Sequence, residues 1–451
     1  MKAHARTPLA LAALAVAAIL ATAPLAPAVA DTVSYALPVI APPAIIDASP
    51  DGSKVVLLSV TSAVSVLDVA SGIESTPVSL GAVSAYNLVV SPTGATALVP
   101  TTDGDLWFVN LATGAVTGPV HFDNYLFDVA FSADGTLAYV TTSVNSIVIV
   151  DVASRTEVGR LTLSLGTAAY GIALAPDGAT LFVTDLSAST LLRVDVATGV
   201  TTGTFATLPS PTEVVVRADG GAYIASFVAS TVASVDPAGN YLAIPLSGSG
   251  PITAITLSPD NGRLYVPRGF GNQVAIVDTT TNTEIAPLVT GVDSRAIAFT
   301  ADGTTALVGD AGTPAVLVIA VDRPPVLAGA APAAVFGVLY SFTVGTGGSP
   351  SPTFALTTGA LPAGLTLDLA SGVISGTPIV PGTSSFSITS TNGSGTATQA
   401  YTLTVAAALA ATGVSPAPLL GGALALLGLG LALIGMQRRA RHWIQETSGV
   451  R

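Results

Sequence analysis

The chain has 451 residues, half of them apolar, and a formal net charge of −12. This composition excludes a disordered polymer, and the length allows a large domain plus a smaller one. No cysteine is present, which excludes disulfides and thiolate metal sites. Between Asp31 and Thr412 stand 26 acidic and nine basic residues. Such a surface repels a phosphate backbone, so we expect no nucleic acid partner.

Residues 1–30 have the order of a secretory signal peptide. A charged start precedes an apolar run over 9–25, and small residues follow at Ala28-Val29-Ala30. An uncleaved anchor helix is the alternative, although Pro24 would interrupt it. We therefore expect an exported chain, cleaved behind Ala30, whose mature form begins at Asp31.

A tight turn, first seen as Ser49-Pro50-Asp51-Gly52, recurs along most of the chain. Apolar runs flank each copy, and Asp-Gly between apolar runs predicts a β-hairpin, because glycine supplies the positive φ of the turn. The seven copies lie 41 to 43 residues apart. Their glycines are Gly52, Gly94, Gly135, Gly178, Gly220, Gly262 and Gly303.

A third apolar run follows each hairpin and ends, in six of the copies, at an Asx residue. Small residues come next, as in the sequence Val-Ala-Ser-Gly, where an Asx side chain can bond backbone ahead of it. A fourth run then leads to the next copy, so each unit predicts four short strands. The Asx residues are Asp68, Asn110, Asp151, Asp195, Asp236 and Asp278.

These units resemble YVTN-type β-propeller repeats. The resemblance rests on Ser-Pro-Asp-Gly turns, on strands such as Leu137–Thr142, and on the Asx turn that follows. It implies an all-β chain whose residues 31–322 form a seven-bladed β-propeller. The seventh unit ends without a fourth strand, so we expect Val33–Leu37 to fill that position and close the ring.

Residues 323–406 form a second module, with alternating strands such as Tyr401–Val405 and a hairpin turn at Asn392-Gly393. The stretch Leu361–Asp368, together with Gly372–Pro378, is similar to the bacterial "putative Ig" repeat, which implies a small β-sandwich that serves as a spacer or an adhesive module. Asp368 is its only acidic residue. We therefore expect no calcium site in this module.

The tail has the order of a sortase sorting signal. A linker over 407–418 precedes an apolar transmembrane helix expected over 419–436, and a basic cytoplasmic tail covers 437–451. The linker contains Leu409-Ala410-Ala411-Thr412-Gly413, which resembles the LAxTG form of the motif. The resemblance implies cleavage behind Thr412 by a sortase and attachment to peptidoglycan. A permanent membrane anchor of the same topology is the alternative.

Candidate binding residues come from one position of the repeat, eight residues before each turn glycine. If this position lies at the start of the innermost strand, its side chains meet at the mouth of a central channel. Together they predict a polar, aromatic-lined pocket for a sugar or peptide. The alternative is that the rings only plug the channel and pack between blades. The residues at this position and the next are Tyr86, Asn87, Phe127, Asp128, Tyr170, Glu213 and Arg295, with Ala44, Thr212 and Thr253 in the other units.

The sequence favours a surface-displayed binding or adhesion protein over an enzyme. It predicts a protein or glycan as ligand, no cofactor and a monomeric chain. His121 is the lone histidine of the exported part, which makes a metal site a poor interpretation. A wall-tethered hydrolase or lyase, with Asp128 and Glu213 as an acid/base pair, stays open, and so does a structural role in the envelope.

Overall fold

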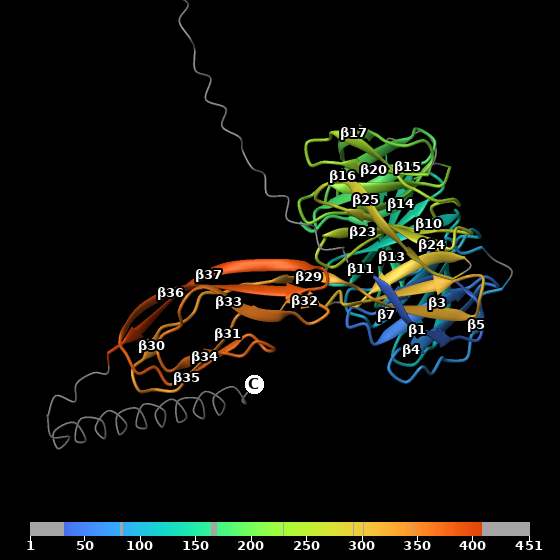
Figure 1. Ribbon diagram of the computed structural model, residues 1–451. Helices are drawn as coiled ribbons and strands as arrows, with labels where there is room; N and C mark the ends of the chain where they lie inside the picture. The colour runs from blue at the N-terminus through green and yellow to red at the C-terminus, as the bar shows by residue number, and fades with distance from the viewer. Residues whose placement is uncertain are drawn as a thin grey trace, which may run out of the picture. The chain divides into compact units, whose positions relative to one another are not determined.

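A computed structural model describes residues 31–81, 84–163, 169–228, 230–291, 293–300, 302–345 and 347–407 (Figure 1). All regular elements of these residues are β-strands. The predicted signal peptide with Ala30, the sorting motif 409–413 and the apolar span 419–436 lie outside the described residues. Within the described ranges, no helix has the length and apolarity needed to span a bilayer.

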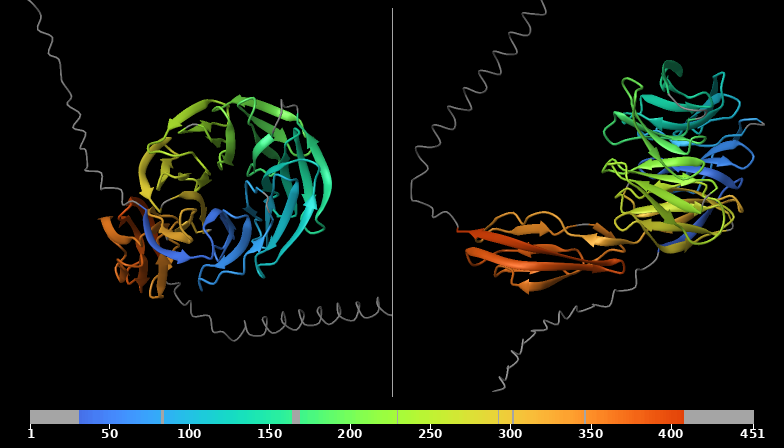
Figure 2. Two further views of the ribbon diagram at one scale, coloured as in Figure 1. Left: turned by 90° about the vertical axis from the view of Figure 1, so that its right-hand side faces the viewer. Right: turned by 90° about the horizontal axis from the view of Figure 1, so that it is seen from above.

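Seven four-stranded antiparallel sheets, counted over the described residues, follow one another along the chain and lie around a ring (Figure 2). We number them sheet 1 to sheet 7. Sheet 1 contains β2 (Pro43–Ala48), β3 (Lys54–Ser59), β4 (Ala63–Asp68) and β5 (Val78–Ser79). Sheet 2 contains β6 (Val89–Val90), β7 (Thr96–Pro100), β8 (Asp105–Asn110) and β9 (Val116–His121). Sheet 3 contains β10 (Leu126–Phe131), β11 (Leu137–Thr142), β12 (Ser146–Asp151) and β13 (Thr156–Thr162).

The next three sheets repeat the same meander of neighbouring strands. Sheet 4 contains β14 (Ala169–Leu174), β15 (Thr180–Asp185), β16 (Thr190–Asp195) and β17 (Thr201–Ala206). Sheet 5 contains β18 (Pro211–Val216), β19 (Ala222–Ser226), β20 (Thr231–Val235) and β21 (Tyr241–Pro245). Sheet 6 contains β22 (Thr256–Leu257), β23 (Arg263–Arg268), β24 (Gln273–Asp278) and β25 (Thr283–Val289).

The recurring turn joins the first two strands of each sheet, as its sequence predicts. Gly52 has a φ of +69° and donates its N–H to the carbonyl of Ser49. The Asp51 carboxylate accepts bonds from the Ser49 hydroxyl and the Ser53 N–H, which lower its pKa. In the sixth copy Asn261, with a φ of +58°, takes the left-handed position in place of the following glycine. The repeated aspartates therefore serve the turns.

The Asx residues at the ends of the third strands also act as predicted. Asp68 ends β4, and its Oδ1 accepts the Ser71 N–H at 2.8 Å. Asn110 ends β8 and accepts the Thr113 N–H at 2.9 Å in the same way. Each bond turns the chain back toward the fourth strand.

The apolar core is divided into clusters that lie between neighbouring sheets. Val56 and Val64 of sheet 1, for example, share a cluster with Ala97 and Val99 of sheet 2. Seven such clusters involve the described residues, one for each pair of neighbours around the ring. Both faces of a middle strand are therefore buried, which explains why these strands are continuous apolar runs instead of alternating ones.

The ring closes through the strand exchange that the sequence predicts. Sheet 7 contains β26 (Ser294–Phe299), β27 (Thr305–Asp310) and β28 (Ala315–Ala320), and its fourth strand is β1 (Thr32–Pro38). The register of β1 against β28 runs from Thr32 opposite Ala320 to Pro38 opposite Ala315. The N-terminal strand thus covers the edge that β28 would otherwise expose.

A buried carboxylate fixes the start of the closing strand. The Asp31 side chain is fully buried and accepts hydrogen bonds from Arg263 Nη1 at 2.8 Å and from the Tyr265 hydroxyl at 2.6 Å. It also accepts the backbone N–H of Asp322 at 2.8 Å. The residue that we predict to be first in the mature chain therefore joins sheet 6 to the segment that follows sheet 7.

The second module consists of two main sheets and a short third one. The first has the order β30-β37-β36-β33, in which β30 is parallel to β37, and the second has the order β31-β35-β34. A two-stranded sheet pairs β29 with β32. The strands are β29 (Arg323–Val326), β30 (Ala334–Val335), β31 (Tyr340–Thr343), β32 (Gly347–Ser349), β33 (Thr353–Gly359), β34 (Leu365–Leu367), β35 (Val373–Gly376), β36 (Gly382–Asn392) and β37 (Gly395–Ala406).

The alternating residues of β36 and β37 form the core of this module. Phe386, Ile388 and Leu403 are buried, and the ring of Tyr401 stacks on Phe386 at 5.9 Å. The Asn392 side chain accepts the N–H groups of the turn that follows it and donates to the carbonyl of Pro350. Asn392 is thus a turn residue.

Replacing Asp31 by Ala should destabilise the ring, because Arg263 and Tyr265 would lose their buried acceptor. We expect the free energy of unfolding, measured by urea denaturation of the full chain, to fall by about 3–5 kcal/mol. Glu157→Ala is the matched control, since Glu157 pairs with Arg160 at the surface. The control should cost less than about 1 kcal/mol. Equal losses in the two variants would contradict a closing role for Asp31.

Candidate functional site

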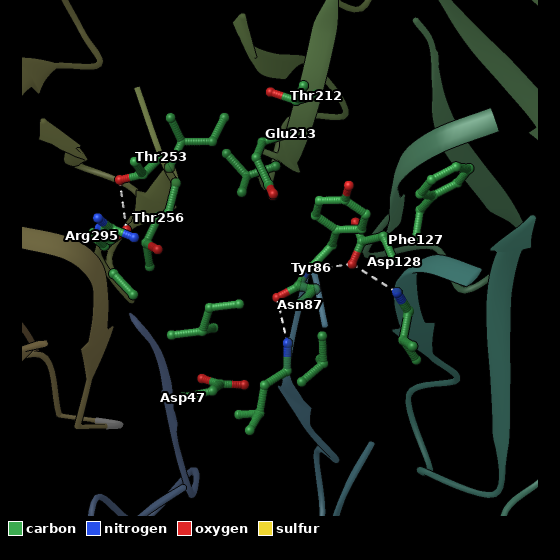
Figure 3. A pocket seen from close by; sticks show the side chains of 18 of the residues that line it. Asp47, Tyr86, Asn87, Phe127, Asp128, Thr212, Glu213, Thr253, Thr256 and Arg295 are labelled. Carbon is green, nitrogen blue, oxygen red and sulfur yellow. Dashed lines mark hydrogen bonds between the residues drawn. The ribbon is translucent and has the colours of Figure 1, made fainter. Parts of the chain in front are cut away.

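A cavity of about 540 Å³ lies where the first strands of the sheets converge, and residues of all seven sheets or of the segments leading into them line it (Figure 3). All seven candidate residues predicted from the repeat lie in its wall, and so do Ala44, Thr212 and Thr253. The residues that stand eight positions before the turn glycines therefore lie around the axis of the ring.

β-Bulges explain why these side chains reach the axis. The register between the first and second strands shifts between Pro43 and Ile45 in sheet 1, and between Leu126 and Val129 in sheet 3. The same irregularity occurs at the starts of β14, β18 and β26. A bulge turns side chains away from the alternation of a regular strand. The residues in the bulges include Ala44, Phe127, Tyr170, Thr212 and Arg295.

Tyr86, Phe127 and Tyr170 form one aromatic wall of the cavity. The Phe127 and Tyr170 rings stack with centroids 4.7 Å apart, and Tyr86 lies 6.1 Å from each. Tyr86 is 49% exposed, and the other two rings are half-buried. The rings thus face the cavity instead of being sealed between sheets.

Asp128 holds three neighbouring sheets together. Its Oδ1 accepts bonds from the Asn87 side chain of the preceding unit and from the N–H of Val129, and its Oδ2 accepts the N–H of Ile172 in sheet 4 at 2.9 Å. Burial raises the pKa of Asp128 to about 6, although these donors oppose the shift. Its interactions are therefore largely structural.

Asp47 plays a similar part in sheet 1 and was not among the predicted site residues. Its carboxylate accepts the N–H of Ala48 at 2.8 Å and that of Val90 in sheet 2 at 2.7 Å. Burial raises its pKa to about 6. An aspartate inside the apolar run of β2 was the available signal, because a charge in such a run needs a partner.

Glu213 differs from these two carboxylates. Within the described residues no donor hydrogen-bonds to it, and it points into the cavity (Figure 3). Burial, and then the charge of Asp128, raise its pKa well above the ordinary value. Gly171 permits this placement, because a Cβ there would collide with the carbonyl oxygen of Thr212. Asp128 and Glu213 therefore share one cavity, as the sequence suggests.

Arg295 also lines the cavity, but its charge is already matched. Its Nη2 lies 2.7 Å from Asp293 Oδ2, and its Nε donates to the same oxygen at 2.9 Å. The guanidinium carbon lies 4.9 Å from the centre of the Phe270 ring. His121, by contrast, lies outside the cavity wall and pairs with Asp105 at 2.7 Å. No group of three or more metal-ligating side chains occurs in the described ranges.

Comparison with known proteins identifies the folds. A family model described as "putative Ig domain" (He_PIG) matches residues 324–406. The hydrazine synthase of Kuenenia stuttgartiensis is similar in structure with a TM-score of 0.55 and 18% identity, over 62% of this chain and 95% of that one. A chain from a crystal structure of the mitotic checkpoint complex is similar with a TM-score of 0.56 and 13% identity, over 70% of this chain and 99% of that one. No curated protein matches.

These comparisons show only the fold, because the sequence identities are low. The chain combines a β-propeller-like fold with an Ig-like domain. The match at 324–406 agrees with the module predicted over 323–406. The propeller-like part holds the cavity, so its side chains must be read for what they can bind.

Stability should rise as the pH falls from 7 to 5. The raised pKa values of Asp47 and Asp128, about 6 each, mean that the folded state binds these protons more tightly than the unfolded chain. This contribution is complete below about pH 4 and is lost as the pH rises through 6, and each carboxyl supplies on the order of 3 kcal/mol. Urea denaturation across this range measures the slope.

Asp128→Asn should reduce that slope by roughly half, because an amide does not titrate and Asp47 still does. Asp134→Asn is the matched control, since hydrogen bonds from its turn lower the pKa of this exposed carboxyl to about 2. It should leave the slope between pH 5 and 7 unchanged. A slope that is as steep as that of the parent chain in both Asp47→Asn and Asp128→Asn would refute the assignment.

Proposed function

We propose that this chain is a cell-surface binding or adhesion protein of a Gram-positive bacterium. Its residues 31–322 are a seven-bladed β-propeller of YVTN type, which acts as the recognition platform, and the Ig-like module is a stalk. The observation that carries this proposal is the cavity on the ring axis. There, three aromatic rings from consecutive units stand beside Glu213, a carboxylate with no hydrogen-bond donor among the described residues.

Chemistry at this position favours binding. Aromatic faces and a few polar groups in a concave site are what small ligands and side chains of partners require. Much of the remaining polar lining is occupied: Asp128 by Asn87 and two backbone groups, and Arg295 by Asp293. An aromatic wall beside the carboxylate of Glu213, which no described residue hydrogen-bonds, suits recognition of a protein or glycan.

A wall-tethered hydrolase or lyase is the second candidate, and one observation favours it. Burial, and then the charge of Asp128, raise the pKa of Glu213, and both carboxyls line one cavity. A protonated Glu213 beside an ionised Asp128 is an arrangement that acid/base catalysis uses. The three donors on Asp128 weigh against this role, because they fix it as a link between sheets.

The proposal extends to the ends of the chain. Export through a signal peptide, cleavage behind Ala30 and sorting at Leu409-Ala410-Ala411-Thr412-Gly413 would place the propeller at the cell surface. The apolar span over 419–436 would hold the motif at the outer membrane face until a sortase joins Thr412 to peptidoglycan. The closing role of Asp31 in the ring supports a mature chain that retains this residue.

Removing the aromatic wall should abolish recognition without unfolding the ring. We expect the double variant Tyr86→Ala/Tyr170→Ala to lose most binding of the full chain to glycan and protein arrays, because each ring supplies contact area to the cavity. Tyr241→Ala is the control, since Tyr241 is exposed on the outer strand β21. Undiminished binding by a folded double variant would remove the cavity from the proposal.

Wall attachment has its own test. Muramidase digestion of the producing cells should release a C-terminal peptide that ends at Thr412 and carries a wall fragment, which mass spectrometry identifies. Thr412→Ala should prevent this linkage. Recovery of the chain through Arg451 from membranes, with none in the wall fraction, would instead favour the permanent anchor.

A further inference from the structure

We infer that the axial cavity binds an organic ammonium group, as carried by a lysine side chain, and that Glu213 is its direct ionic partner. The inference rests on the proposed recognition role of this cavity and adds the charge and chemistry of the ligand. Three features carry it: the charge of the wall, the hydrogen-bonding state of Glu213, and the aromatic rings beside it.

The cavity wall carries an excess of acidic side chains. Asp47 on β2, Asp128 on β10 and Glu213 on β18 all line it. The one cationic side chain in the wall, within the part of the chain that the structure describes, is Arg295, whose guanidinium is bound to Asp293. An incoming cation therefore meets three carboxyl groups and no free positive charge, whereas an anion would be repelled.

Among these carboxyls, Glu213 is the one that no donor of the described residues hydrogen-bonds. Asp128 receives three hydrogen bonds, and Asp47 receives two from backbone N–H groups. Glu213 receives none within the described residues. Glu213 is half-buried at the cavity wall, so its oxygens are accessible to a ligand. An ammonium group would supply both hydrogen-bond donors and the opposite charge.

The aromatic wall adds to the same preference. The electron-rich faces of tyrosine and phenylalanine attract cations, most strongly where water is excluded. Burial, and then the charges of Tyr86 and Glu213, raise the pKa of Tyr170, so the rings lie within electrostatic reach of this carboxyl. Tyr86, Tyr170, Asp128, Asp47 and the Arg295–Asp293 pair are the titratable and charged groups that surround Glu213 in the wall.

Exposed aromatic residues at two loops provide contacts beyond the ammonium group. Phe227, in the loop after β19, is 59% exposed and belongs to the cavity wall. Phe270, in the loop after β23, is 71% exposed and lies against Arg295. Apolar surface at these two loops suits the methylene stem of a lysine side chain and the peptide on either side of it. A compact ion such as ammonium has no such apolar part.

Calorimetric titration of the full chain tests the inference. The probes are a Gly-Gly-Lys-Gly-Gly peptide with blocked ends, the same peptide with an acetylated lysine, and n-butylamine. We expect the unmodified peptide to bind and the acetylated one to bind more weakly by about tenfold or more, because acetylation removes the charge. If butylamine binds as tightly as the peptide, the result supports a free amine as the ligand. If the peptide binds more tightly, the result supports a lysine of a partner protein.

Glu213→Gln should weaken binding of the lysine peptide by about tenfold or more while leaving the shape of the cavity intact. Glu157→Gln, on the outer strand β13, is the matched control and should bind like the parent chain. Thermal unfolding of both variants verifies that they are folded. Unchanged binding by a folded Glu213→Gln chain would overturn the inference.

The pH dependence separates an ammonium ligand from a neutral sugar. A cation favours the ionised form of Glu213, so binding should release a proton and strengthen as the pH rises from 5 to 8. Titration in two buffers of different ionisation heat measures the released proton. Equal affinity for the free and acetylated peptides would overturn the inference. Binding of a sugar that depends on Tyr86 and Tyr170, without binding of the lysine peptide, would also overturn the inference. The proposed recognition role of the cavity would then still hold.

Discussion

A closed ring is the constraint on which the rest of this structure depends. Each sheet buries both faces only because a neighbour packs on either side, and the pairing of β1 with β28 links sheet 7 to the chain that enters sheet 1. Val316 and Val318 of β28 share one apolar cluster with Ile46 and Leu57 of sheet 1, and Leu37 of β1 packs against it. Hydrophobic burial around the whole circle thus depends on one seven-residue strand and on the carboxylate that precedes it.

Two of the acidic residues at the axis link neighbouring sheets of the ring. Asp47 and Asp128 each bond a backbone N–H of the following sheet, which satisfies donors at the narrow end where the strands converge. Their burial opposes ionisation, and the hydrogen bonds offset part of that cost. Glu213 sits among them without such a link. This difference in hydrogen bonding, more than position in the repeat, separates the structural carboxylates from a candidate binding group.

Much of this architecture could be predicted from the sequence because it is repeated. The turns, the Asx bends after the third strands and the closing strand Val33–Leu37 follow from local chemistry and from counting strands, and so does the convergence of Tyr86, Phe127 and Tyr170 at the axis. The bonds of Asp128 and the role of Asp47 could not be predicted, since they join positions more than 40 residues apart. Whether a carboxylate is paired depends on the bulges and on atomic distances, which no spacing rule encodes.

The closing strand also dictates an order of events. Asp31 bonds to Arg263 and Asp322, which lie 232 and 291 residues further along the chain. The first strand of the ring can therefore pair only after β28, much further along the chain, has formed. Contacts of such sequence separation slow folding. A chain interrupted before β28 would carry an unsatisfied strand at each end, open to pairing with a second copy.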